Sequence, residues 1–452
     1  MSRSVDPVRT PPSTPMRRVA IASCVGTTIE FYDFFIYGTA AALVFPKVFF
    51  PALGPAAGTI AAFATFAVAF VARPLGAAIF GHFGDRIGRK KTLISTLLLM
   101  GISTVLIGLL PSAAQIGVLA PILLIALRIA QGLAVGGEWA GATLLAAEYA
   151  PKHKRGMYAL FPQLGPSLAF ALSSVTFLTV NLFVGEASGA FLEYGWRIPF
   201  LASALLVLVG LYVRLNVEET PMFSRLTRQP RSGAGPLVGV FKHQPRELLL
   251  AAGALAMMFA FFYIGTAYLT AYGTATVGLS RGTVLSLGLL AAVVFAAATA
   301  LSATYSDRIG RRTMVLASCV LSIPGGLALF PLIDTGSPVA FFAGLSLTLV
   351  IMGISYGPAG ALLPEMFRTE YRYTGAGMAY AIAGVIGGGT APILAAQLAA
   401  RHGGAAIGWM LAGFGVLSLV CTLFLPETRH RGMEAPVEAT SPPESRSVSE
   451  TP

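Results

Sequence analysis

Long apolar runs separated by short polar segments follow one another along the chain, from near residue 20 to near residue 425. Twelve runs of about 20 residues can be distinguished, which is the length that an α-helix needs to cross the hydrocarbon core of a bilayer. Their centres lie near residues 32, 69, 102, 128, 170, 205, 261, 292, 323, 350, 387 and 414. None shows the strict alternation over about ten residues that marks a transmembrane β-strand. The pattern predicts an all-α integral membrane protein with twelve transmembrane helices.

A polar loop occurs twice and divides the chain into two related halves. The sequence Asp-Arg-Ile-Gly-Arg follows the second run as residues 85–89 and the eighth run as residues 307–311. Because each copy follows the second span of a six-span unit, a duplicated six-helix bundle explains the spacing. The predicted organisation is an N-terminal tail (1–18), a first bundle (19–215), a linker (216–246), a second bundle (247–428) and a disordered C-terminal tail (429–452).

Charged residues are few, and most of the basic ones fall in alternate loops. Only 11% of residues are charged, against about 25% in a soluble domain, and 55% are hydrophobic. With both termini placed in the cytoplasm, all but six of the 31 Lys and Arg residues lie on cytoplasmic segments, as basic residues in short loops should. We therefore expect a multi-pass protein of the cell (plasma) membrane with both termini cytoplasmic. Contact with anionic membrane lipids then accounts for the net charge of +11, and no nucleic-acid partner is expected.

The first copy of the loop and several other motifs carry a family resemblance. Residues 81–90 match the Gly-x-x-x-Asp-Arg-x-Gly-Arg-Arg/Lys loop signature of the major facilitator superfamily, whereas the second copy has Ala303 in place of the first glycine. More specifically, the chain resembles the metabolite:proton symporter family, which includes shikimate, α-ketoglutarate, citrate and proline/betaine carriers. The motifs are Glu30-Phe31-Tyr32-Asp33-Phe34, Arg73-Pro74-Leu75-Gly76, Gln131-Gly132, Gly136-Gly137-Glu138-Trp139, Gly195-Trp196-Arg197-Ile198-Pro199-Phe200 and Glu218-Glu219-Thr220-Pro221.

This resemblance implies a secondary active transporter that works by alternating access. Its expected activity is proton-coupled uptake of a small carboxylate or zwitterion, such as a shikimate-like organic acid, a dicarboxylate, proline or betaine. The alternatives are a drug or metabolite:proton antiporter that exports its substrate, and an uncoupled facilitator of the same fold. The protein is expected to function as a monomer.

Charged residues inside the predicted spans are candidates for proton coupling, because a charge is costly in a bilayer and is therefore rare without a function. The candidates are Glu30 and Asp33 in the first span and Arg128 and Glu138 in the fourth. The rise of about 1.5 Å per residue places Asp33 and Arg128 at similar depths, so an ion pair between them is a hypothesis. Protonation of Asp33, or arrival of substrate, would break that pair and let the helices rock. A permanently paired structural bridge is the alternative.

Residues that could contact substrate lie in both halves. Arg73 is near the depth of Glu30, so it either forms a second ion pair or binds a substrate carboxylate through its planar guanidinium. Tyrosines of the second half offer hydroxyls and aromatic faces, although some tyrosines anchor spans at the membrane interface. The candidate substrate-binding residues are Arg73, Arg128, Tyr37, Gln131, Tyr263, Tyr268 and Tyr356.

A cytoplasmic gate is implied by the resemblance, because related facilitators close the cytoplasmic side with a charge network between the two loop signatures and neighbouring acids. Solvated ion pairs contribute individually only about 0 to 1 kcal/mol, so only a network can bias the conformational equilibrium. The matching residues are Asp85, Arg86, Arg89, Glu148, Asp307, Arg311, Glu365 and Arg372.

The sequence contains no pattern typical of catalysis, metal binding or cofactor binding. The outer loops carry acidic residues and His402 without a nucleophile or a paired-carboxylate motif, and no Walker-type loop is present. Three cysteines lie within predicted spans without metal-ligand spacing, so we interpret them as packing residues. We therefore expect a transporter with no enzymatic activity, no metal and no cofactor.

Overall fold

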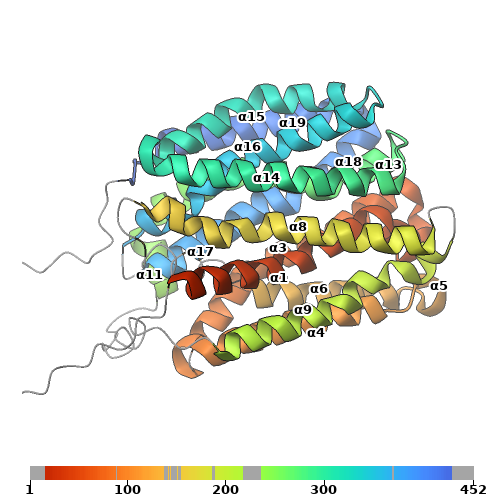
Figure 1. The fold of residues 1–452 in the computed structure, drawn as a ribbon, viewed down its shortest axis with the longest axis horizontal. Helices are drawn as coiled ribbons and strands as arrows, with labels where there is room; N and C mark the ends of the chain where they lie inside the picture. Colours follow the sequence, from red (N-terminus) through yellow and green to blue (C-terminus); the bar gives the residue numbers. More distant parts are fainter. Residues whose placement is uncertain are drawn as a thin grey trace, which may run out of the picture.

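The computed structural model describes residues 16–87, 89–136, 141, 143, 150, 154–185, 189–216, 236–368 and 371–429. Within these ranges every regular element is a helix, and the long helices run side by side as one elongated bundle (Figure 1). Both ends of the described chain lie at the same end of this bundle, on the left in Figure 1. We call it the terminal end and the other the opposite end.

The first half of the chain supplies six long helices. They are α1 (Met16–Leu43), α3 (Gly54–Ile87), α4 (Arg89–Leu109), α6 (Leu119–Val135), α8 (Arg155–Val184) and α9 (Arg197–Asn216). Short helical segments, α2 (Phe45–Val48), η1 (Pro51–Leu53), α5 (Ala113–Ile116) and η3 (Phe191–Gly195), connect some of them at the opposite end.

The second half repeats this arrangement, but two of its six spans are interrupted by wider π-helical turns. The first composite span comprises α12 (Pro245–Tyr263), η4 (Ile264–Tyr268) and α13 (Leu269–Ala275), and the second comprises α17 (Arg372–Ala383), η5 (Gly384–Gly389) and α18 (Thr390–His402). The others are α14 (Arg281–Ile309), α15 (Arg311–Ile333), α16 (Pro338–Met366) and α19 (Gly404–Leu423), and α11 (Pro236–His243) precedes the half. These helices coincide with the twelve apolar runs of the sequence, so the predicted twelve-helix fold is confirmed.

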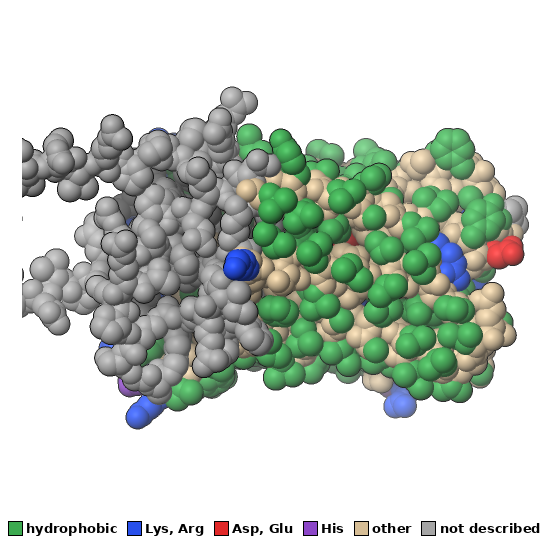
Figure 2. Space-filling model, turned by 90° about the horizontal axis from the view of Figure 1, so that it is seen from below, with side chains coloured by type: hydrophobic (Ala, Val, Ile, Leu, Met, Phe, Trp, Pro, Cys, Tyr) green, Lys and Arg blue, Asp and Glu red, His purple; other side chains and the backbone are tan. Residues whose placement is uncertain are grey.

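Apolar side chains cover the flanks of the bundle, as a lipid environment requires. Nine helices in the described ranges are long and apolar enough to cross a membrane, and α4 and α6 contain shorter apolar stretches. The remaining helix, α1, is 28 residues long and carries Glu30 and Asp33 in its interior. Figure 2 shows hydrophobic side chains spread over the described part of one flank. Exposed examples include Val71, Leu75, Leu205 and Leu208.

The two halves meet along α1, α3 and α8 of the first and α14, α16, η4 and η5 of the second. The longest contact between the halves is that of α8 with α14, while α3 packs against η5 and α1 against η4. In the second loop copy, Gly310 has a φ of 115°, a left-handed conformation that favours glycine and turns the chain sharply from α14 into α15.

Glycines on α3 and α6 let these two helix backbones touch. A Cβ atom added to Gly132 would lie 2.3 Å from the carbonyl oxygen of Ala69, and one added to Gly136 would lie 2.1 Å from that of Arg73. A Cβ atom on Gly76 of α3 would in turn lie 2.0 Å from the carbonyl oxygen of Leu133. Small residues at such crossings allow the close packing that associates helices in membranes. This packing holds Arg73 and Arg128 at a fixed separation.

Substitution of Gly132 by alanine should therefore destabilise the protein, because the added methyl group must push α3 and α6 apart. Overpacking of this kind costs about 1–3 kcal/mol. We expect a lower melting temperature in detergent and a lower yield of monodisperse protein on size-exclusion chromatography. The control is Gly413→Ala in α19, where an added Cβ atom meets no atom within 4 Å. Equal melting temperatures for the two variants would contradict the proposed tight contact.

Candidate functional site

A cluster of aromatic rings lies where α1, α3 and α12 meet in the middle of the bundle. The rings of Phe34 and Phe70 are 5.8 Å apart, and those of Phe66 and Phe70 are 5.4 Å apart. Tyr263 closes the cluster from the second half, with its ring 5.3 Å from Phe66 and 5.0 Å from Phe70. The Phe34 ring and the Asp33 carboxylate of α1 both interact with Arg128 of α6.

Two arginines place their guanidinium groups against these rings. The guanidinium carbon of Arg73 is 4.2 Å from the centre of the Phe34 ring and 4.5 Å from that of Phe70. That of Arg128 is 4.6 Å from the Phe34 centre and 3.9 Å from that of Tyr37. Both residues are almost inaccessible, with 3% and 0% exposure, and their charges repel each other. Two positive charges thus share one aromatic surface, which attracts cations through its negative face.

Each of these guanidinium groups retains unused hydrogen-bond donors. The Nε and Nη2 atoms of Arg73, and the same two atoms of Arg128, are buried and have no hydrogen-bond partner in the described part of the chain. A buried donor that lacks a partner carries a desolvation cost of about 1–3 kcal/mol, and more when the group is charged. The arrangement therefore offers several unused N–H groups to an anion.

Asp33 is connected to Arg128 through two neutral side chains. The Thr104 hydroxyl donates to Oδ2 of Asp33 at 2.8 Å, and Nε2 of Gln131 donates to the Thr104 hydroxyl oxygen at 2.7 Å. Nη1 of Arg128 donates to Oε1 of Gln131 at 2.9 Å. The hypothesis of a direct Asp33–Arg128 ion pair is therefore wrong for this conformation. The two residues do join one hydrogen-bonded chain, but Thr104 of α4 and Gln131 of α6 separate their charges.

Glu30 lies near Arg73, as its depth predicted. The two side chains line one small pocket with Val135 and Gly136 of α6 and with Gly377, Tyr380 and Ala381 of α17. Glu30 is 3% exposed. The pocket places an acid and a base of the first half against α17 of the second, between the central rings and the terminal end. Glu138, the fourth proton-coupling candidate, lies outside the described residues.

The tyrosine candidates differ in the hydrogen bonds and ring contacts that they make within the protein. The Tyr37 hydroxyl donates to Thr65 at 2.7 Å, and that of Tyr268 donates to the carbonyl oxygen of Ala395 at 3.3 Å. Tyr356 is fully buried in α16, with its ring 6.3 Å from Phe295. The backbone of Tyr356 accepts a hydrogen bond from Gln163 of α8. Tyr263 contacts the central rings and interacts electrostatically with both arginines, whereas Tyr37 lies against Arg128.

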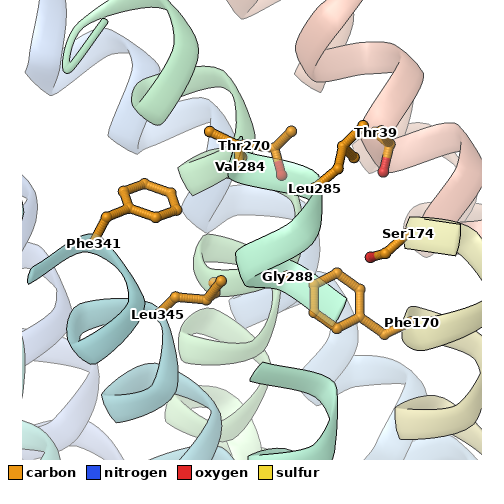
Figure 3. A pocket seen from close by; sticks show the side chains of 10 residues that line it. Thr39, Phe170, Ser174, Thr270, Val284, Leu285, Gly288, Phe341 and Leu345 are labelled. Atoms are coloured by element: carbon orange, nitrogen blue, oxygen red, sulfur yellow. The ribbon is translucent and has the colours of Figure 1, made fainter. Parts of the chain in front are cut away.

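A second pocket between the halves was not predicted from the sequence. Figure 3 shows its lining, with Thr39 of α1 and Ser174 of α8 facing Thr270 and Leu285 of the second half. The complete lining is Thr39, Phe170, Ser174, Gly265, Thr270, Val284, Leu285, Gly288, Phe341 and Leu345. Its polar side-chain groups are the hydroxyls of Ser and Thr residues, whereas the site residues predicted from the sequence are charged residues, one glutamine and tyrosines. The pocket lies towards the opposite end, near the start of α14.

The terminal end is closed by carboxylates that join the two halves. Asp307, at the end of α14, accepts hydrogen bonds of 3.0 Å from the backbone N–H groups of Gly156 and Met157. These groups belong to the first turn of α8, where an anion is favoured by the unpaired N–H groups and the helix dipole. Arg311 contacts the same carboxylate at 2.8 Å. Asp307 of the second half therefore caps a helix of the first.

Glu365 forms the second carboxylate link. Its Oε1 atom is 3.8 Å from Nη1 of Arg155 in the first half and 3.5 Å from Nη2 of Arg311 in the second. Its Oε2 atom accepts a hydrogen bond of 2.7 Å from the Thr428 hydroxyl. The structure thus brings together three of the predicted gate residues, Asp307, Arg311 and Glu365. Arg372, a fourth, is buried at the first position of α17.

Two gate contacts were missed because they come from the segment after the last span. Glu427 accepts hydrogen bonds from the backbone N–H groups of Arg311 and Arg312 at 2.9 and 3.1 Å, so it caps α15. Together with Thr428 it ties this segment to the network. The sequence signal that could have identified Glu427 is an acidic residue just after the last span, which would lie beside a basic loop. Of the other predicted gate residues, Glu148 lies outside the described residues, and the side chains of Asp85, Arg86 and Arg89 are also outside them.

Comparisons with known proteins agree with this architecture. The family model described as Major Facilitator Superfamily matches residues 24–392. The inner membrane metabolite transport protein YhjE of Escherichia coli (strain K12) is 44% identical over 427 residues, which cover 93% of this chain and 97% of that protein. The shikimate transporter of the same organism is 40% identical over 388 residues, which cover 84% of this chain and 87% of that protein.

A solved structure shows the same fold at low sequence identity. The partially occluded inward open conformation of the xylose transporter XylE from E. coli has a TM-score of 0.71 and 18% identity, and the match covers 92% of this chain and 99% of that chain. The family model spans most of this chain, and the relatives align over nearly their whole lengths. The chain therefore belongs to the major facilitator superfamily and is a multi-pass membrane transporter rather than an enzyme.

Proposed function

We propose that the protein takes up a small organic anion together with a proton, and that a substrate carboxylate binds between Arg73 and Arg128. The observation that carries this proposal is the pair of buried guanidinium groups whose Nε and Nη2 atoms have no hydrogen-bond partner among the described residues. A buried charged group with unsatisfied donors is expensive, so a ligand that supplies acceptors and the opposite charge recovers free energy. A carboxylate can accept two N–H groups from one guanidinium, and the aromatic rings would cover the rest of a small cyclic or branched acid.

An anion is favoured over the zwitterions considered from the sequence. The positive end of proline or betaine would have to approach two like charges that already share the Phe34 ring. Like charges repel strongly when they lie close together in a region of low dielectric constant. Glu30 could offset this repulsion only on the α17 side of Arg73. The shikimate transporter, a relative whose name gives its cargo, carries an acid of the favoured class.

Asp33 is the proposed proton carrier, with Glu30 and Glu138 as further candidates. Asp33 is 1% exposed, and its Oδ1 atom has no hydrogen-bond partner in the described part of the chain. Asp33 is therefore a buried carboxylate that can receive a proton, and its hydrogen bond with Thr104 must adjust when it does. Coupling then requires that the protonation of Asp33 and the binding of the anion depend on each other.

Alternating access is proposed to proceed by opening and closing of the contacts at the terminal end. Asp307 and Glu365 join the two halves there, and both would release their first-half partners when that end opens. We place this end in the cytoplasm of the cell, with the protein in the inner (plasma) membrane and working as a monomer. The excess of basic residues at this end and the inner membrane relative support that placement.

Purified protein in proteoliposomes should accumulate shikimate or another panel acid when the outside is more acidic than the inside. The panel would contain shikimate, α-ketoglutarate, proline and glycine betaine, each radiolabelled and tested with and without an imposed pH gradient. Accumulation of an acid that disappears with the gradient is the expected result. Uptake that is indifferent to the gradient would eliminate symport, and accumulation of betaine alone would eliminate the anion site.

Asp33→Asn should abolish accumulation while leaving exchange across the membrane measurable. The amide retains the shape of the carboxylate and can still contact Thr104, but it cannot take up a proton at neutral pH. The measurements are gradient-driven uptake and counterflow of the same labelled acid. Gradient-driven accumulation at the unmodified level would refute the role of Asp33.

Arg73→Gln should raise the half-saturation concentration for the transported acid by about tenfold or more, because hydrogen bonds to a charged group contribute about 1.5–3 kcal/mol. The matched control is Arg401→Gln, at an exposed arginine in the last turn of α18. Counterflow as a function of substrate concentration gives the half-saturation values. The same value in both variants would show that Arg73 does not contact the substrate.

Glu365→Gln should weaken closure of the terminal end, because the amide cannot pair with Arg155 and Arg311. Spin labels at Ser95→Cys on α4 and Thr313→Cys on α15, introduced after replacement of the native cysteines, would report the distance between the halves. We expect a larger fraction of long distances than in the labelled parent. Glu193→Gln, at an exposed glutamate near the opposite end, is the control, and an unchanged distance distribution in Glu365→Gln would rule out the gate role.

A further inference from the structure

We propose that Thr104 and Gln131 form a relay that communicates the protonation state of Asp33 to Arg128, and that this relay couples the proton to the anion. The inference rests on the proposed function and adds two positioning residues to it. Neither residue needs to carry the proton or to touch the substrate. Each acts through the orientation of its hydrogen bonds.

The four side chains form a continuous chain that is sealed from solvent. Asp33 and Gln131 are 1% exposed, while Thr104 and Arg128 are 0% exposed. The successive hydrogen bonds measure 2.8, 2.7 and 2.9 Å and connect α1, α4 and α6. Because no water competes for these groups, a change at one end of the chain must be accommodated by the others.

Every donor in the chain is directed towards the Asp33 carboxylate. Arg128 donates to Gln131, Gln131 donates to Thr104, and Thr104 donates to Asp33. This direction fits an ionised Asp33 at one end and a positive Arg128 at the other, joined by two neutral dipoles aligned between the charges. In the empty state, the negative charge of Asp33 therefore compensates part of the positive charge of Arg128.

The Thr104 hydroxyl has a second acceptor within reach, which makes the chain switchable. Its single proton can be directed to Oδ2 of Asp33 at 2.8 Å or to the carbonyl oxygen of Met100 at 3.0 Å. When a proton from the aqueous side forms an O–H bond on Asp33, that group can donate to Thr104, and Thr104 then turns its own proton to Met100. The Thr104 oxygen still accepts from Gln131. The proton later leaves Asp33 for the aqueous phase on the other side, so none is consumed.

The switch changes what Arg128 requires from its surroundings. A neutral Asp33 no longer compensates the guanidinium, whose Nε and Nη2 atoms have no partner among the described residues. A substrate carboxylate becomes the compensating charge, and its affinity rises. By thermodynamic reciprocity, the bound anion favours the protonated form of Asp33 to the same extent. The anion site and the proton thus become linked through two uncharged side chains.

Among the residues that the structure describes, few other charged groups act on Asp33. Arg128 of α6 and Tyr32 of α1 are the titratable groups with which it interacts, and Arg73 of α3 and Tyr263 of α12 face Arg128. In α4, α8 and α9 the charged residues lie in the first or last turns, at the ends of the bundle. The relay is therefore the direct connection from Asp33 to the proposed anion site.

Thr104→Val tests the relay, because valine fills a similar volume but carries no hydroxyl. The probe is the panel acid that the unmodified protein accumulates, beginning with radiolabelled shikimate. In the unmodified protein, the half-saturation concentration in counterflow should rise as pH increases across a range from acidic to mildly alkaline. In Thr104→Val we expect this pH dependence to shrink by about tenfold and gradient-driven accumulation to fall towards the level without a gradient. Gln131→Leu should behave in the same way.

Two further variants separate coupling from folding. Thr104→Ser retains the hydroxyl and should restore the pH dependence. Ser103→Ala removes the neighbouring hydroxyl, whose hydrogen bond goes only to the carbonyl oxygen of Leu99 in its own helix, and should leave the pH dependence intact. A folded Thr104→Val protein with unchanged pH dependence and accumulation would overturn the relay while leaving the proposed function in place. A failure to fold in Thr104→Val, together with an uncoupled Thr104→Ser, would also overturn it. Absence of gradient-driven acid uptake by the unmodified protein would overturn both.

Discussion

Two guanidinium groups rest on one phenylalanine ring in the middle of an apolar bundle, and much of the surrounding structure follows from the cost of keeping them there. A charge inside a bilayer must be compensated by protein, water or a ligand. The rings of Phe34, Phe66, Phe70 and Tyr37 supply part of this compensation, and Gln131 supplies one hydrogen bond. The close packing of α3 against α6, which depends on Gly132 and Gly136, prevents the two positive charges from relaxing apart. The packing therefore keeps the unused donors in place for the anion that we propose.

Alternation between two states requires contacts between the halves that are individually weak but together strong enough to hold one state. The terminal end meets this requirement with carboxylates that accept from backbone N–H groups and arginines of both halves. Asp307 is stabilised by the backbone N–H groups in the first turn of α8. This contact is lost as soon as the helix moves by a few ångströms. Glu365 contacts Arg155 of the first half and Arg311 of the second, so its side chain links the two halves. In the proposed mechanism, breaking a few such contacts together favours the open form.

Sequence patterns located the spans and the charged residues well, because hydropathy and helical rise depend only on distance along the chain. The common depth of Asp33 and Arg128 is an example, since both do join one buried network. Rotation of each helix about its axis and the identity of its neighbours depend on packing between distant segments. For that reason Thr104, an unremarkable residue of the third span, and the hydroxyl-lined pocket of Figure 3 could not be predicted. Glu427 was missed for a similar reason, since its partners are more than 100 residues away in the sequence.

The hydrogen-bonded chain from Arg128 to Asp33 also has an electrical consequence. In the empty state Asp33 is negative while Arg73 and Arg128 are positive. In the proposed loaded state Asp33 is neutral, both arginines stay positive, and the substrate brings the negative charge. For a cargo with one carboxylate, the net charge of the central site is then the same in the empty and the loaded carrier. A membrane voltage acts on a displaced charge with about 2.3 kcal/mol per 100 mV. A carrier built in this way would draw its driving force from the difference in acidity alone, and a cargo with two carboxylates would have to move against an inside-negative voltage.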